Sequence, residues 1–175
     1  HKTQNPLGKY VLFIGWRVNY KNFKPTVEAL VDTNYKLAIV GPPLNSAEIK
    51  YLDNTIGNDK YESFVRISDE ELNALYNNAY ALVYPSEYEG FGIPVLEAQR
   101  AGCPVIAYNG SSIPEIIGDK SLLLNKVCVS EIQEKLSLLE NEEFRQSIIQ
   151  RGFDNAKKYS WNKMGEDYIS LYNEI

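Results

Sequence analysis

The chain has 175 residues, which is enough for one domain with its own core but short for two. Its hydrophobic content of 44% and charged content of 23% are those of an ordinary globular protein, and no apolar stretch is long enough to span a membrane. A net charge of −5 without a basic run argues against nucleic acid as a partner. Two cysteines and one terminal histidine are too few for a disulfide framework or a structural zinc site, and they favour a reduced, cytoplasmic protein.

Short apolar runs alternate with helical patterns along the chain, beginning at residue 10. The first run, residues 10–14, is closed by Gly15 and predicts a buried strand. Further strands are predicted, in chain order, at residues 37–40, 64–67, 81–84, 105–108 and 122–124. Helices are predicted at residues 24–32, 46–54, 68–78, 94–101, 112–117, 131–139, 142–159 and 163–173. Ser68 and Glu71 form a capping box that marks the start of the third helix.

This alternation predicts an α/β, Rossmann-like domain over residues 9–175, preceded by a loose polar lead-in at residues 1–8. Its parallel sheet of about six strands is expected to carry helices on both faces. Ligands bind such sheets outside the carboxyl ends of the strands. The predicted loops at that edge carry Gly15, Arg17, Lys21, Gly41, Glu89 and Ser111.

The most informative stretch is residues 86–99, which follow a predicted strand. It contains the turn Glu89-Gly90-Phe91-Gly92, whose two glycines let the backbone approach a ligand closely. Pro94 is well placed as the first residue of the next helix, because its missing N–H is no loss there. Strand, glycine turn and helix together aim free N–H groups and the positive end of the helix dipole at an anion.

Two carboxylates flank this predicted anion site. Glu89 lies before the helix and Glu97 lies one turn into it, with seven residues between them. A carboxylate accepts two hydroxyl hydrogen bonds at once, so the pair favours a ligand that carries hydroxyls as well as phosphate. A sugar, a phosphate and a ribose in one ligand make a nucleotide sugar. On the residues alone, both glutamates could also be solvated surface residues.

The same stretch resembles the donor-site signature of retaining glycosyltransferases of family 4, which have the GT-B fold. That signature has two glutamates separated by seven residues, with a Glu-Gly-Phe-Gly turn between them. The similarity continues at residues 15–22, 101–106 and 111–118, and it covers about residues 10–172. It implies that the chain is the C-terminal, donor-binding domain of such an enzyme. The last helix, at about residues 163–173, is expected to reach toward a missing N-terminal domain.

The resemblance implies roles for individual residues at the predicted strand ends. Glu89 is expected to meet the hydroxyls of the transferred sugar, Glu97 those of the ribose, and Lys21 the diphosphate. Arg17 is expected to join Lys21, although the family's arginine usually follows the glycine directly and Trp16 stands there in this chain. Catalytic roles are thus predicted for Glu89, Arg17 and Lys21. The predicted donor-binding residues are Gly15, Gly41, Val65, Arg66, Glu89, Gly90, Phe91, Gly92, Ile93, Glu97 and Ser111.

The function that the resemblance implies is transfer of a hexose, such as mannose, from a nucleotide-diphosphate sugar to a glycan or lipid-linked acceptor in polysaccharide biosynthesis. The acceptor would be held by the missing domain, which could also bring the enzyme to a membrane surface. No metal or other cofactor is expected, because fixed cations and backbone amides can stabilise the departing diphosphate. Two alternatives stay open: a nucleotide-sugar epimerase of GT-B fold and a non-catalytic nucleotide-sugar-binding module.

Overall fold

The computed structural model describes residues 7–160 and residue 169, and within them the chain forms one six-stranded sheet. The strand order is β3-β2-β1-β4-β5-β6, and every neighbouring pair is parallel, which confirms the predicted α/β sheet. The order reverses between β1 and β4, the kind of point at which doubly wound sheets bind ligands. The strands are β1 (Tyr10–Ile14), β2 (Lys36–Val40), β3 (Tyr61–Phe64), β4 (Ala81–Tyr84), β5 (Val105–Tyr108) and β6 (Leu123–Leu124).

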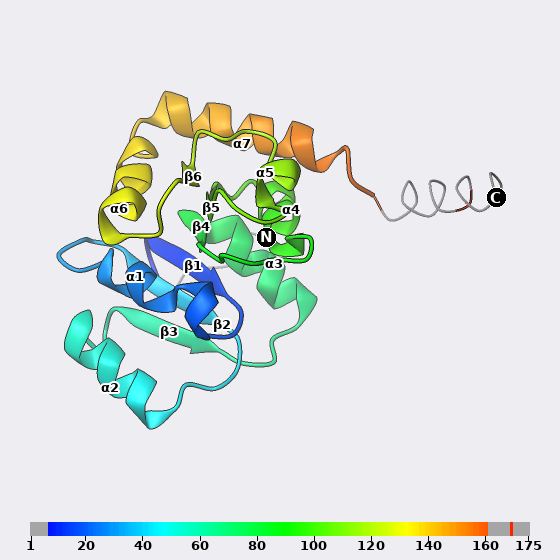
Figure 1. Cartoon of the computed structure of the whole chain (residues 1–175). Coiled ribbons are helices and arrows are strands. Elements are labelled where there is room, and N and C mark those ends of the chain that lie inside the picture. The colour runs from blue at the N-terminus through cyan, green and yellow to red at the C-terminus, as the bar shows by residue number, and fades with distance from the viewer. Residues whose placement is uncertain (1–6, 161–168, 170–175) are drawn as a thin grey trace.

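Helices cover both faces of this sheet. Figure 1 shows α1, α2 and α6 on one side of the sheet and α3, α4 and α5 on the other, while α7 runs along its β5–β6 end. The helices are α1 (Phe23–Glu28), α2 (Ser46–Thr55), α3 (Asp69–Asn78), α4 (Ile93–Arg100), α5 (Ile113–Ile116), α6 (Val129–Leu138) and α7 (Glu142–Ala156). A short 3-10 helix, η1 (Asn19–Lys21), precedes α1 and was not expected from the sequence.

The two hydrophobic cores follow from the alternation of side chains along each strand. In β1, Val11 and Phe13 face the core that α1, α2 and α6 cover, and Tyr10 and Leu12 face the core under α3, α4 and α5. All four side chains are buried. Because β1, β4 and β5 are apolar on both faces, they are continuous apolar runs in the sequence, whereas the edge strand β3 contains Glu62 and Ser63.

The third strand was predicted three residues too late. The prediction placed it at residues 64–67, whereas β3 runs from Tyr61 to Phe64 and pairs in register with β2. Arg66 has a φ of 54°, in the left-handed region, which an extended strand cannot contain. The apolar Val65 and Ile67 misled the prediction, because they line the loop after the strand.

Several helix boundaries also differ from the prediction. The first helix, expected to end at Asp32, ends at Glu28, and Asp32 adopts a φ of 57°. The last described helix ends at Ala156, three residues before the predicted end. Within the expected loose lead-in, Leu7 is buried and joins the core under α3 and α4. Residues 1–6 and the helix predicted at residues 163–173 lie outside the described part, apart from the single residue 169.

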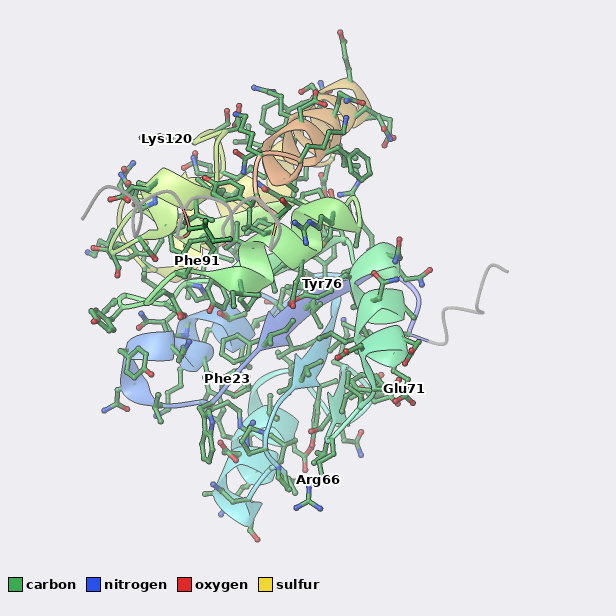
Figure 2. All side chains as sticks on the ribbon, turned by 90° about the vertical axis from the view of Figure 1, so that its right-hand side faces the viewer. Phe23, Arg66, Glu71, Tyr76, Phe91 and Lys120 are labelled. Carbon is green, nitrogen blue, oxygen red and sulfur yellow. The ribbon has the colours of Figure 1, made fainter. Side chains whose placement is uncertain are left out.

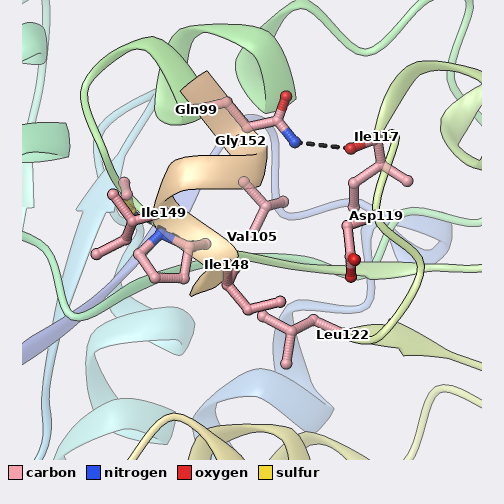
Figure 3. Close-up of a pocket in the computed structure, with 10 residues that line it drawn as sticks. Gln99, Val105, Ile117, Asp119, Leu122, Ile148, Ile149 and Gly152 are labelled. Atoms are coloured by element: carbon pink, nitrogen blue, oxygen red, sulfur yellow. Dashed lines mark hydrogen bonds between the residues drawn. The ribbon is translucent and has the colours of Figure 1, made fainter. Parts of the chain in front are cut away.

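The seam between α4 and α7 is held by buried amides. Asn155 of α7 donates to Gln99 Oε1 at 2.8 Å and to the carbonyl of Ile116 at 2.7 Å. Gln99 in turn donates to the carbonyl of Ile117 at 2.8 Å, the bond drawn in Figure 3. The cavity in that figure has a volume of about 20 Å³, which is room for one water molecule and not for a substrate. This seam is therefore a structural joint.

Replacing the amide at this joint should destabilise the domain. Asn155→Ala would leave Gln99 Oε1 and the Ile116 carbonyl without their donor in a buried place, at a cost of about 1–3 kcal/mol in the free energy of unfolding. The exposed Gln146 of the same helix provides the control, and Gln146→Ala should change the free energy of unfolding by less than about 0.5 kcal/mol. Urea denaturation of both variants measures the difference, and equal stabilities would contradict this account of the joint.

Candidate functional site

The carboxyl ends of β1 and β2 meet at two glycines. The N–H of Gly15 donates to the carbonyl of Val40 at 2.9 Å, and Gly15 has a φ of 124° that favours glycine. A Cβ atom added to Gly41 would lie 2.5 Å from the Gly15 carbonyl oxygen. Gly41, predicted to bind the donor, is thus required by the close approach of two strand ends, whether or not a ligand binds there.

Two loops far apart in the sequence are joined beside these strand ends. Asn22, which follows η1 with a φ of 53°, donates from its side chain to the carbonyl of Pro85 at 3.0 Å. The N–H of Glu87 donates to the carbonyl of Tyr20 at 2.9 Å. These two bonds fix the loop after β1 against the loop after β4, across the reversal in strand order.

This junction brings Lys21 to Glu89. Lys21 Nζ donates to Glu89 Oε1 in an ion pair, and each side chain is only 13% exposed. Two aromatic rings surround the ammonium group: Nζ lies 5.2 Å from the ring centroid of Tyr84 and 5.6 Å from that of Tyr20. The structure therefore gathers two of the three predicted catalytic residues into one partly buried, charged cluster.

Tyr84 lies beneath this ion pair and was not identified as a site residue from the sequence. It is the last residue of β4 and is buried. Burial raises the pKa of its hydroxyl, and a hydrogen bond with Glu89 raises that pKa further. Tyr84 therefore stays protonated at neutral pH and can donate a hydrogen bond to an oxygen at the strand ends. Its position at the carboxyl end of a buried strand was the signal that could have revealed it.

The main chain of Glu89 is held by two serines after β5. Ser111 Oγ donates to the Glu89 carbonyl at 2.7 Å and accepts from the Glu89 N–H at 3.2 Å. Ser112 Oγ donates to the same carbonyl at 3.0 Å. Ser111 does this with a φ of 54°, a strained value for serine of the kind that clusters at functional sites. Ser111, predicted to bind the donor, thus positions the main chain of Glu89.

The glycine turn connects Glu89 to α4. A Cβ added to Gly90 would meet nothing within 4 Å, whereas Gly92 has a φ of 95° and a Cβ there would lie 2.8 Å from Ile113 Cδ1. No side chain caps the start of α4, whose first residue is Ile93 rather than the predicted Pro94. Phe91 is 46% exposed and meets the ring of Tyr159 edge-on, so it does not plug the core. Among the described residues, the start of α4 therefore has no side-chain cap.

Glu97 has a different kind of partner from Glu89. Tyr76 of α3, which is buried, donates from its hydroxyl to Glu97 Oε2 at 2.9 Å. Burial and the nearby Glu97 carboxylate both raise the pKa of Tyr76, so this hydroxyl is a neutral donor. Figure 2 shows Tyr76 beside α4, with Phe91 at the start of that helix. One oxygen of Glu97 is engaged, and a carboxylate has lone pairs left for ligand hydroxyls.

Arg17 is not gathered into the Lys21 cluster. Its Nε donates to Glu48 Oε1 at 2.6 Å, and its Nη2 donates to the carbonyl of Pro43 at 2.9 Å. The Arg17 side chain is only 6% exposed. Burial alone would raise the pKa of Glu48, but bonds from Arg17 and the Asn45 N–H outweigh it and lower that pKa. Arg17 therefore clamps the loop between β2 and α2. Its Nη1 is buried, has no hydrogen-bond partner among the described residues and lies near Gly41, so the expected contact with phosphate stays a prediction.

A separate hollow of about 440 Å³ lies at the ends of β1, β2 and β3. It includes the predicted residues Gly41, Val65 and Arg66, and we call it the strand-end hollow. Arg66 is exposed and projects from the surface in Figure 2. The other lining residues are Trp16, Val40, Pro42, Pro43, Ile67 and Leu72. Its lining is mostly apolar, in contrast to the charged cluster around Lys21.

The described residues offer little support for a metal centre or a membrane span. Over residues 7–160 and 169, no group of three or more His, Cys, Asp or Glu residues is arranged to hold a metal ion. In the same part of the chain, no helix has the length and apolar character needed to cross a membrane. Metal independence itself stays a prediction.

The fold and the site together define a class of protein: a Rossmann-like domain with a cation, two carboxylates and an open helix start at the reversal in strand order. The family described as "Glycosyl transferases group 1" matches residues 2–155. The chain belongs to this family, which confirms the resemblance seen in the sequence.

Individual relatives agree with this membership. The chain is 31% identical over 172 residues to O-antigen chain mannosyltransferase B of Escherichia coli, covering 93% of this chain and 45% of that protein. It is 27% identical to the C-terminal domain of the group 1 glycosyl transferase LpcC of Francisella tularensis, with a TM-score of 0.73 and 86% of each chain covered. The fold also matches Anabaena HepE in complex with UDP and glucose, with a TM-score of 0.80 and 16% identity, over 96% of this chain and 49% of that one. The chain thus spans about half the length of the full-length proteins it matches.

Gly41 at the end of β2 and Gly90 in the turn before α4 should respond differently to an added methyl group. Gly41→Ala should lower the free energy of unfolding by about 1–3 kcal/mol, because the new Cβ overlaps the Gly15 carbonyl. Gly90→Ala should leave the free energy of unfolding within about 0.5 kcal/mol of the parent, because its Cβ meets open space. Urea denaturation compares them, and a Gly41→Ala protein as stable as Gly90→Ala would show that the strand ends can separate.

Proposed function

We propose that this chain is the nucleotide-sugar-binding half of a retaining hexosyltransferase that acts on a glycan or lipid-linked acceptor. The observation that carries the proposal is the Lys21–Glu89 ion pair, placed where the uncapped start of α4 also lies. A cation and free helix N–H groups suit a diphosphate, and the carboxylates of Glu89 and Glu97 suit the hydroxyls of two sugar rings. The chain spans about half of its full-length relatives, so we assign the acceptor site to a further domain.

In this proposal the chain binds and orients the donor and stabilises its leaving group. The bond between the anomeric carbon of the sugar and the diphosphate oxygen breaks, and its electron pair stays with the diphosphate. The acceptor hydroxyl oxygen forms the new bond to that carbon, and its proton passes to the departing diphosphate. Lys21 and the N-terminal end of α4 offset the charge that develops there. Glu89, whose main chain Ser111 and Ser112 fix, orients the transferred sugar. We give Arg17 a positioning role, because its guanidinium is engaged by Glu48 and Pro43.

Relatives and solved structures support a class of donor. Mannosyltransferases of bacterial O-antigen chains are among the relatives, which favours mannose as the hexose. HepE holds UDP and glucose on a similar fold, which supports a nucleotide-diphosphate sugar as the ligand class. We propose that the site works without a metal, so addition of EDTA should not weaken donor binding. The epimerase and the non-catalytic binder stay as alternatives, and no observation favours either of them.

Loss of the cation tests the proposed function. The 175-residue chain should bind GDP, UDP or ADP, and Lys21→Ala should weaken that binding by about tenfold to a hundredfold, the range for a hydrogen bond to a charged group. The exposed Lys24 gives the matched control, and Lys24→Ala should leave binding unchanged. Calorimetry with each nucleotide and with its nucleoside measures the effect. No binding of any nucleoside diphosphate at millimolar concentration would refute the proposal.

The ion pair also predicts an unusual gain of affinity. Glu89 already accepts a hydrogen bond from Lys21, so it competes with an incoming diphosphate for that lysine. Glu89→Gln should therefore bind bare nucleoside diphosphate up to about fivefold more tightly, the upper range for the loss of an exposed charge pair. The same change should reduce the extra affinity that the attached sugar provides. Glu115→Gln, at an exposed carboxylate of α5, controls for net charge. Weaker diphosphate binding by Glu89→Gln would show that the pair does not compete with the ligand.

A further inference from the structure

We propose that Trp16 determines the preference of the donor site for the nucleotide base, and that it favours purines. This inference rests on the proposed function, because it needs a nucleotide whose diphosphate lies at Lys21. Trp16 is 67% exposed although it follows directly after Gly15 at the end of β1. Its indole lines the strand-end hollow together with Pro42 and Pro43.

The position of the hollow relative to Glu97 indicates that it receives the base. Glu97 is held by Tyr76 of α3, and Leu72 of the same helix lines the hollow. Residues four apart on a helix are neighbours on one face, about 5–6 Å apart. A ribose at Glu97 therefore places its attached base within reach of the hollow, while the diphosphate extends toward Lys21 and α4.

The chemistry of the hollow suits a flat ring rather than a charged group. Arg66 is the one charged side chain among its lining residues, and Pro42 and Pro43 have no backbone N–H to offer an anion. The carbonyl of Pro43 already accepts from Arg17. A base stacks on an aromatic side chain through its π-face, and a fused purine ring covers more of an indole than a pyrimidine does.

The hollow is also fixed in shape by its neighbours. On one side of Trp16, the N–H of Gly15 donates a hydrogen bond to the carbonyl of Val40 in β2. On the other side, the buried Arg17 binds both Glu48 and Pro43, which holds the Pro42–Pro43 loop against the loop that carries Trp16. A contact surface that is already ordered loses little entropy when a ligand binds. The backbone on both sides of Trp16 is therefore held in place by contacts of Gly15 and of the Arg17 side chain, which do not involve the indole ring itself.

The test compares bases on one diphosphate scaffold. The chain and its variants Trp16→Ala and Trp16→Phe are titrated by calorimetry with GDP, ADP, UDP, CDP and inorganic pyrophosphate. The parent should bind GDP and ADP several-fold more tightly than UDP and CDP. Trp16→Ala should lose about tenfold for the purine nucleotides and less for the pyrimidines, with pyrophosphate unchanged. The affinities of Trp16→Phe for the purine nucleotides should lie between those of the parent and those of Trp16→Ala.

Controls separate this inference from the proposed function. Tyr88→Ala removes another exposed aromatic ring, one that does not line the hollow, and it should keep the purine preference. Two results would show that the inference is wrong while the proposed function stands. In the first, nucleoside diphosphates bind and Trp16→Ala keeps the parent's affinities. In the second, Trp16→Ala loses affinity for pyrophosphate and for every nucleotide to the same extent. If the parent binds no nucleoside diphosphate, both fail. If circular dichroism shows that Trp16→Ala does not fold, Trp16→Phe provides the test. A Trp16→Phe protein with the same affinities and the same purine preference as the parent would then overturn the inference.

Discussion

The site depends on the junction between the loop after β1 and the loop after β4. Asn22 reaches the Pro85 carbonyl, and the Glu87 N–H reaches the Tyr20 carbonyl, so two loops more than sixty residues apart share one frame. Without these bonds Lys21 would be one more lysine on a surface loop. With them its ammonium lies beside Glu89 in a place where water is largely displaced. Because a charge interaction strengthens as water is excluded, the same cation attracts a diphosphate more strongly there than on an open surface.

The sequence predicted five of the six strands well, because each of these five contains a continuous apolar run. It predicted the class of the site because the loops at one edge of the sheet carry the polar residues. What it could not predict were contacts made by tertiary packing. The pairing of Arg17 with Glu48 depends on how the β2–α2 loop folds back, which no local pattern encodes. The third strand was misplaced for a related reason: Val65 and Ile67 are apolar because they line a hollow, not because they pair in a sheet.

Arg17 illustrates how a residue can matter to a site without touching its ligand. Its guanidinium is buried, its carboxylate partner has a lowered pKa, and its bond to Pro43 fixes a loop that lines the strand-end hollow. Removing Arg17 from Glu48 would leave an unpaired carboxylate in a partly buried place, which is costly, so we expect the pair to persist. The Nη1 of Arg17 has no partner among the described residues. The motif that places an arginine two residues after Gly15 thus has a structural explanation in this chain.

The two glutamates of the signature carry the same charge but differ in what a ligand must displace. Tyr76, the partner of Glu97, is neutral and buried, so a ribose can add its hydroxyl bonds to Glu97 while the Tyr76 bond remains. Lys21, the partner of Glu89, is the group that binds the diphosphate in the proposed function. In that proposal a nucleotide meets Glu97 without breaking an ion pair, whereas its diphosphate competes with Glu89. A donor that carries a sugar replaces the bond that Glu89 loses, because the sugar's hydroxyls can then donate to the released carboxylate. A bare diphosphate cannot do this, so the ion pair itself favours the complete donor over the product that remains after transfer.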